Sequence, residues 1–207
     1  MGDLQIAWGN VMQILPLTVF AAIALFAVKE GVEFWRRYKG NNRKRRALRK
    51  LLADEVERNF FQIKRIRDCA NTVERAIDEG VLIAEKNVDL SIIDGAFGRK
   101  YLRLSNDKRL TSQMPIGEVH NNVLSTNLLE IAIVDNKIFE SALETSDAIK
   151  ELEHLLMSLV EQVTSFDNGF IDGFSGYVRS ETVCIEATLK NFYNLLTGKE
   201  LEQFRIR

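Results

Sequence analysis

The stretch from Leu4 to Val28 constrains this chain most, because it contains no charged side chain. A helix needs roughly 20 apolar residues to cross the hydrocarbon core of a bilayer. A water-soluble helix of this length would show one polar face, and this stretch has none. The sequence therefore predicts a transmembrane helix within an N-terminal segment that covers residues 1–34.

The residues that flank this stretch predict its retention and its orientation. A cleaved signal peptide begins with positive charge, whereas this N-terminus carries Asp3 and no Lys or Arg. Trp8 lies near one end of the stretch, and Trp35 and Tyr38 follow the other end, as amphipathic aromatic residues do at the two membrane interfaces. The positive-inside rule places the basic residues after the stretch in the cytoplasm. We therefore expect a single-pass protein with its N-terminus outside and its C-terminal domain in the cytoplasm.

Three residues of the predicted span are candidates for the assembly of several copies. Asn10 and Gln13 lie about one turn apart, and such polar side chains hydrogen-bond between helices in a bilayer. Pro16 removes one backbone hydrogen bond and kinks the helix. The alternative is that Asn10 and Gln13 lie at the outer interface and that the kink is only tolerated.

A basic collar follows at residues 35–50. Ten of the 28 Lys and Arg residues lie between Lys29 and Lys50, whereas the chain from Leu51 onward carries 18 basic and 26 acidic residues. Each basic side chain near an anionic leaflet contributes on the order of 1 kcal/mol of attraction. We expect the collar to contact the membrane surface, and nucleic-acid phosphates are the alternative ligand. The expected contact residues are Arg36, Arg37, Lys39, Arg43, Lys44, Arg45 and Arg46.

Residues 51–207 are predicted to form a cytosolic domain of packed amphipathic helices. Apolar residues recur at spacings of three and four in long segments with short joints, which is typical of a helical bundle. Gly80 and Gly198 are expected to end the first and the last helix, and Gly40-Asn41-Asn42 is expected to interrupt the chain before the first. The predicted helices cover residues 44–79, 118–134, 137–165 and 177–196.

Residues 81–115 are less regular than the rest of the domain. Val81–Ala84 and Tyr101–Leu104 are compatible with short strands or with helical turns. Asp94-Gly95 and Gly98 mark turns between them. The predicted fold class is therefore all-α, with one N-terminal transmembrane helix followed by a cytosolic helical bundle that includes a short irregular segment.

No pattern in the sequence is typical of an enzyme or of a metal site. His120 and His154 lie outside any metal-ligand spacing, and Cys69 and Cys184 are too far apart to indicate a disulfide framework. The Gly-rich run 169–176 lacks the Lys of a phosphate-binding loop and is interpreted as a joint between helices. We predict no catalytic residue, no cofactor, no metal and no small-molecule substrate.

A group of carboxylates near the collar is interpreted as structural. Asp54, Glu55 and Glu57 lie close in sequence to basic residues of the same predicted helix. Ion pairs along a helix explain such a pattern, at a few tenths of a kcal/mol each. An acid–base pair would need a cleft, which the sequence does not indicate.

Several stretches together resemble a group of bacterial single-span membrane proteins with a helical cytosolic domain. One such stretch is Leu51-Leu-Ala-Asp-Glu-Val-Glu-Arg-Asn-Phe60, which follows the collar. A later one is Ile133-Val-Asp-Asn-Lys-Ile-Phe-Glu-Ser-Ala-Leu143, followed by Ile149-Lys-Glu-Leu152. The chain resembles in particular the transmembrane effector of retrons, which pair a membrane protein with a reverse transcriptase and its RNA–DNA product. The shared motifs are helix patterns, so no site residues carry over.

The resemblance implies an antiphage effector in the bacterial inner membrane. It would be held inactive by the reverse transcriptase with its non-coding RNA and msDNA, and release would let copies associate and disrupt the membrane, which arrests growth of the infected cell. Its expected partners are therefore the lipid bilayer, further copies of itself and that complex. The alternative is a non-toxic, membrane-tethered scaffold that recruits a cytosolic partner through its amphipathic helices.

Overall fold

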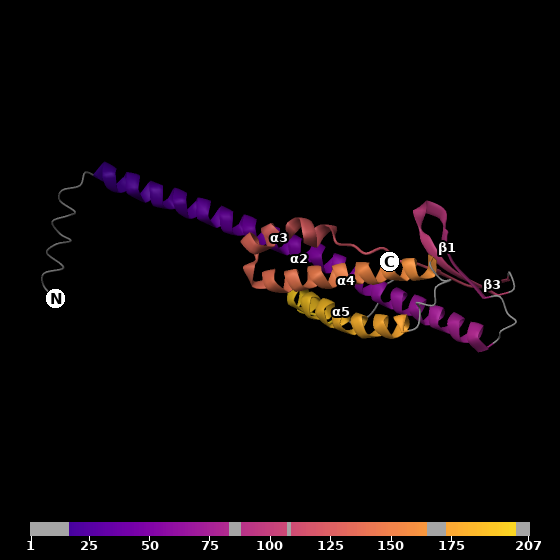
Figure 1. Ribbon diagram of the computed structural model, residues 1–207. Helices are drawn as coiled ribbons and strands as arrows, with labels where there is room; N and C mark the ends of the chain where they lie inside the picture. Colours follow the sequence, from indigo (N-terminus) through magenta and orange to yellow (C-terminus); the bar gives the residue numbers. More distant parts are fainter. Residues whose placement is uncertain (1–16, 83–87, 107–108, 165–172, 202–207) are drawn as a thin grey trace. The chain divides into compact units, whose positions relative to one another are not determined.

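The computed structural model of the chain describes residues 17–82, 88–106, 109–164 and 173–201 (Figure 1). The chain divides into two compact units, Met1–Arg46 and Ala47–Arg207. Within the described residues the protein is mostly helical, with one small antiparallel sheet. The elements are α2 (Leu17–Leu82), β1 (Val88–Asp94), η1 (Ala96–Gly98), β2 (Lys100–Asn106), β3 (Arg109–Pro115), α3 (Asn122–Val134), η2 (Asn136–Ile138), α4 (Phe139–Thr164) and α5 (Phe174–Thr197).

Helix α2 runs without interruption through the Gly40-Asn41-Asn42 stretch, so the predicted break there is wrong. In a helix Gly costs about 1 kcal/mol and Asn at most about 0.7 kcal/mol relative to Ala, whereas restarting a helix requires a new, unfavourable nucleus. No proline lies in the described part of the helix to remove a backbone hydrogen bond. The helix ends at Leu82, two residues beyond the predicted stop at Gly80.

The remaining helices agree with the predicted segments to within a few residues. Helix α3 begins at Asn122 rather than at residue 118, and α4 and α5 begin at Phe139 and Phe174. The predicted stop after α5 is confirmed, because Gly198 adopts a left-handed φ of 70° and donates its N–H to the Asn194 carbonyl at 2.7 Å.

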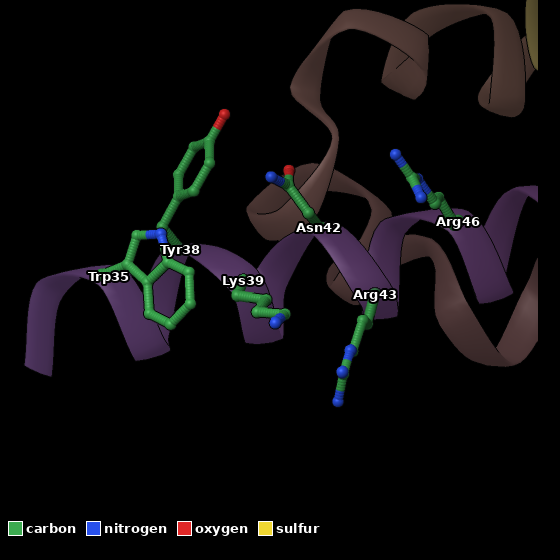
Figure 2. A pocket seen from close by; sticks show the side chains of 6 residues that line it. All are labelled: Trp35, Tyr38, Lys39, Asn42, Arg43 and Arg46. Carbon is green, nitrogen blue, oxygen red and sulfur yellow. The ribbon is translucent and has the colours of Figure 1, made fainter. Parts of the chain in front are cut away.

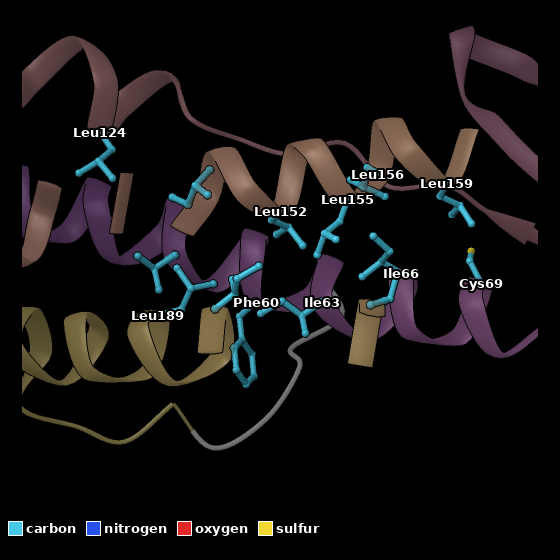
Figure 3. Packing of buried hydrophobic residues seen from close by; sticks show 14 of the residues in the cluster. Phe60, Ile63, Ile66, Cys69, Leu124, Leu152, Leu155, Leu156, Leu159 and Leu189 are labelled. Atoms are coloured by element: carbon cyan, nitrogen blue, oxygen red, sulfur yellow. The ribbon is translucent and has the colours of Figure 1, made fainter. Parts of the chain in front are cut away.

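The core of the second unit lies between the part of α2 that follows Arg46 and helices α3, α4 and α5 (Figure 3). Helix α4 packs against α5, α3 and β1. In Figure 3 the leucines of α4 point toward the apolar face of α2, with Leu159 facing Cys69. All residues of the predicted apolar seam are buried: Ile138 in η2, and Ala142, Ile149, Leu152, Leu156, Leu159 and Val163 in α4.

The segment that was expected to be irregular forms a three-stranded antiparallel sheet in the order β1-β2-β3. The all-α prediction therefore holds for the helices but omits this small sheet. Leu90 pairs with Leu104, and Leu102 pairs with both Ile92 and Met114. Because alternate residues of a strand point to one face, these side chains share a face, and they pack into or against the core. Gly98, with a φ of 72°, lies in the connection between β1 and β2, where turns were expected.

The two cysteines are unpaired and differ in accessibility: Cys69 is buried and Cys184 is exposed. Burial, together with the negative charge of Asp68, raises the pKa of the Cys69 thiol to about 12, against a smaller opposing effect of Arg65. Because the thiolate is the reactive species, we expect Cys184 alone to react with a thiol reagent in the native protein at about pH 8. Both should react after denaturation, and fast native labelling of Cys69 would contradict the packing described.

A polar cluster joins α2 to α5. Arg67 donates from Nε to the Thr182 hydroxyl at 2.8 Å and from Nη1 to Glu186 at 2.7 Å. Lys190 also donates to Glu186, at 2.7 Å. Partial burial alone would raise the pKa of Glu186, but the hydrogen bonds and charges of Lys190 and Arg67 outweigh it and lower that pKa.

The lowered pKa of Glu186 predicts a pH dependence of stability. A carboxylate whose folded-state pKa is depressed contributes stability above its unfolded pKa and loses it as the pH falls through the folded value. We therefore expect Glu186→Gln to flatten the decline in the free energy of unfolding below about pH 5. Urea unfolding as a function of pH measures this, with the exposed Glu153 replaced by Gln as a control. Parallel curves for Glu186→Gln and the unchanged protein would contradict it.

Candidate functional site

The seven basic residues predicted to contact a membrane all lie on the part of α2 within the first unit. Six of them are exposed, and Arg45 is half-buried. Because α2 continues through Gly40, the spacing of these residues along the helix decides which of them share a face. A helix broken at Gly40, as the sequence predicted, would leave the relative directions of these basic side chains undetermined.

One face of this helix carries a shallow hollow of about 300 Å³. Figure 2 shows the six side chains that line it, which come from successive turns of α2 and, at spacings of three or four residues from one turn to the next, share a broad face. They are Trp35, Tyr38, Lys39, Asn42, Arg43 and Arg46. Three of the predicted basic residues therefore meet at the hollow, together with both aromatic residues that were expected at the interface. Asn42 was missed because it was assigned to a break.

The other basic residues of the collar do not line the hollow. Arg37 and Lys44 lie seven residues apart, about two turns, on the opposite face of the helix. Arg37 forms an ion pair with Glu33 at 3.6 Å. At the hollow, by contrast, the Lys39 ammonium lies 4.8 Å from the centre of the Trp35 ring. A cation this close to the face of an indole is attracted by the negative charge of the ring face.

The helix before the hollow exposes apolar side chains on all sides. Leu17 is 87% exposed and Phe34 is 73% exposed. The other large apolar residues that are exposed in this stretch are Phe20, Ile23, Leu25, Phe26, Val28 and Val32. Fully burying such a side chain is worth about 1.5–3 kcal/mol relative to leaving it in water. Lys29, Glu30 and Glu33 interrupt these apolar residues toward the end of the stretch.

In the part of the chain that the structure describes, no helix is both long enough and apolar enough to cross a membrane. The predicted span starts at Leu4, and its residues 4–16 lie outside the described part. Trp8 and the three predicted assembly residues, Asn10, Gln13 and Pro16, also lie there.

A buried polar stripe on α2, which the sequence did not reveal, binds the segment before and at the start of α3. The two carboxylate oxygens of Glu55 accept the N–H groups of Val123 and Leu124 at 2.8 and 2.7 Å. Asn59 donates to the His120 carbonyl at 2.5 Å and accepts from the His120 N–H at 2.8 Å. Glu55 therefore caps α3, whose own N-cap residue makes no side-chain cap hydrogen bond.

The carboxylates near the collar thus have different partners. Asp54 accepts a hydrogen bond from Arg58 at 2.7 Å, as the helical ion-pair interpretation expected. Glu57 accepts one from the Tyr193 hydroxyl at 2.7 Å, so it links α2 to α5. Arg49 reaches away from its own helix and binds Asp135 at 2.6 Å.

The described residues do not gather metal-binding side chains at one point. No group of three or more His, Cys, Asp or Glu side chains among them could hold a metal ion. His154 is exposed, and the backbone of His120 is hydrogen-bonded to Asn59. The hollow on α2, with cations and aromatic rings but no carboxylate, can bind an anion beside an apolar phase.

No known protein family, curated protein or solved structure matches this chain. The resemblance to retron effectors and the function it implies therefore stay predictions.

Proposed function

We propose that this protein is a membrane-anchored effector of bacterial antiphage defence, held in the inner membrane by a single N-terminal helix. The observation that supports the anchor is the order of features along α2. Exposed apolar side chains extend to Phe34, with Lys29, Glu30 and Glu33 among the last of them, and Trp35, Tyr38 and the basic collar follow. This order is typical of a helix that leaves a bilayer on its cytoplasmic side.

The proposed mechanism requires no enzymatic step. The helical domain binds a regulatory complex, a reverse transcriptase with its non-coding RNA and msDNA. Its release lets the anchors associate through Asn10, Gln13 and the Pro16 kink, which breaches the inner membrane and arrests growth.

A specific surface favours the alternative of a non-toxic scaffold. Leu129 and Ile133 lie one turn apart on α3, and each is 76% exposed. Two adjacent apolar residues on an exposed helix face are typical of helix-based recognition of a partner. A scaffold would use this face to recruit a cytosolic protein and would leave the membrane intact.

Expression of the chain without partners in a bacterial host separates the two functions. We expect growth arrest and loss of membrane potential for the unchanged chain. Leu25→Lys with Phe26→Lys, which places charges in the anchor, should abolish both effects, whereas Leu129→Lys with Ile133→Lys should leave them intact. A harmless chain in a membrane that stays polarised would contradict the effector. Partner capture that is lost in the Leu129 and Ile133 variant would then support the scaffold.

A further inference from the structure

We propose that the hollow on α2 is a binding site for the phosphate of an anionic lipid headgroup. The inference rests on the proposed membrane anchoring and adds a specific ligand site to it. A general electrostatic attraction would involve all basic residues of the collar alike. The arrangement around the hollow instead distinguishes Lys39, Arg43 and Arg46 from the basic residues on the other faces.

The hollow provides several hydrogen-bond donors along its length. The guanidinium groups of Arg43 and Arg46 point to opposite sides of the helix in Figure 2, and each suits the oxygens of a phosphate, which an arginine can bind in a bidentate manner. The Lys39 ammonium and the Asn42 amide add further donors on the same face. No Asp or Glu occurs between residues 34 and 53, so no neighbour in sequence competes for these donors.

The aromatic residues favour a lipid over a nucleic acid as the source of the phosphate. Trp35 and Tyr38 line the hollow on the side of the exposed apolar stretch. Amphipathic rings of this kind lie at the depth of the headgroups, where a lipid phosphate is also found. A phosphate bound at Arg43 would lie about two turns of helix beyond Trp35, on the side away from the apolar stretch.

The hollow is open to an approaching headgroup. It has a volume of about 300 Å³ and lies on the outside of one helix, so a phosphate can reach its side chains directly. Because the hollow is lined by one helix face, the acyl chains of the lipid can lie along the apolar residues that precede Trp35.

Fluorescence of Trp35 can report on binding, because the Lys39 ammonium lies against its ring. The chain contains two tryptophans, so Trp8→Phe leaves Trp35 as the only one. We would titrate this full-length chain, in neutral detergent micelles, with short-chain phosphatidylglycerol, short-chain phosphatidylcholine and a single-stranded oligonucleotide. We expect saturable binding of phosphatidylglycerol, with a clear preference over phosphatidylcholine.

Two matched double variants test whether the hollow is the site. Arg43→Gln with Arg46→Gln removes two charges from the hollow, and Arg37→Gln with Lys44→Gln removes two from the opposite face. We expect the first pair to weaken binding of phosphatidylglycerol at least about tenfold. The second pair should weaken it less than about threefold, because salt screens charges that do not contact the ligand.

Three results would overturn the proposal. Equal losses in the two pairs would show a diffuse electrostatic field, and tighter binding of the oligonucleotide would identify a nucleic-acid site. Absence of saturable binding, in a chain that still depolarises the membrane, would refute the headgroup site and leave the effector function standing. Saturable binding in a chain that is harmless when expressed alone would support the headgroup site and refute the effector function.

Discussion

Replacing Asp135 by Ala should lower the free energy of unfolding of the helical domain by about 3 kcal/mol. The Asp135 side chain is 0% exposed and accepts a hydrogen bond from Arg49 Nε at 2.6 Å. The same guanidinium lies 3.3 Å from the Leu195 carbonyl of α5, so Arg49 links α2 to α5 and to the joint between α3 and η2, where Asp135 lies. Without Asp135, the Arg49 charge, whose side chain is only 29% exposed, loses its counter-ion while still partly buried.

Asp147 provides the matched control for Asp135. It also forms an ion pair, with Lys150 at 2.9 Å, but its side chain is 76% exposed. Exposed pairs contribute only about 0–1 kcal/mol, so Asp147→Ala should change stability little. Urea unfolding of the full chain in neutral micelles, followed by circular dichroism, compares the two variants. Equal effects would show that Asp135 does not hold the Arg49 link as described.

Replacing Glu55 by Ala should cost about 2–4 kcal/mol, because two buried hydrogen bonds are lost together. Glu55 is only 5% exposed and accepts the N–H groups of Val123 and Leu124 in the first turn of α3. Its negative charge also interacts favourably with the positive end of the helix dipole. In the variant, the N–H groups of Val123 and Leu124 lose their acceptor at a position that is largely buried.

Two further variants make the Glu55 prediction specific. Glu55→Gln keeps one acceptor oxygen and should lose less stability than Glu55→Ala. The neighbouring Asp54 forms an exposed pair with Arg58, so Asp54→Ala should cost less than about 1 kcal/mol. Amide hydrogen exchange then locates the effect, since Glu55→Ala should lower protection of the α3 amides first. Unchanged protection at Val123 and Leu124 would contradict the capping role.

The helices could be predicted because their pattern is encoded locally. In α4, Ile149, Leu152 and Leu159 recur at helical spacing, and all three are buried in the core. The sheet was harder to predict because its strands are short. Leu102 and Leu104 alternate with polar residues over only a few positions, which a helical turn also permits. Pairing with β1 and β3 decides between the two, and that pairing cannot be read from one segment.

The polar contacts between helices could not be predicted at all. The sequence places Glu55 beside Arg58, which favours an ion pair, whereas its true donors lie 68 and 69 residues away. The candidate site was predicted in part: its basic residues were identified as a group. Their division between two faces depends on the continuity of α2 through Gly40, where local propensity predicted a break.

The central claim, a single anchor with the helical domain on the cytoplasmic side, is tested most directly by adding protease to sealed spheroplasts. We expect the chain to remain with the membranes after an alkaline wash. A C-terminal epitope should stay protected until the spheroplasts are lysed. An intact chain in the soluble fraction, or removal of the epitope from sealed spheroplasts, would contradict the account.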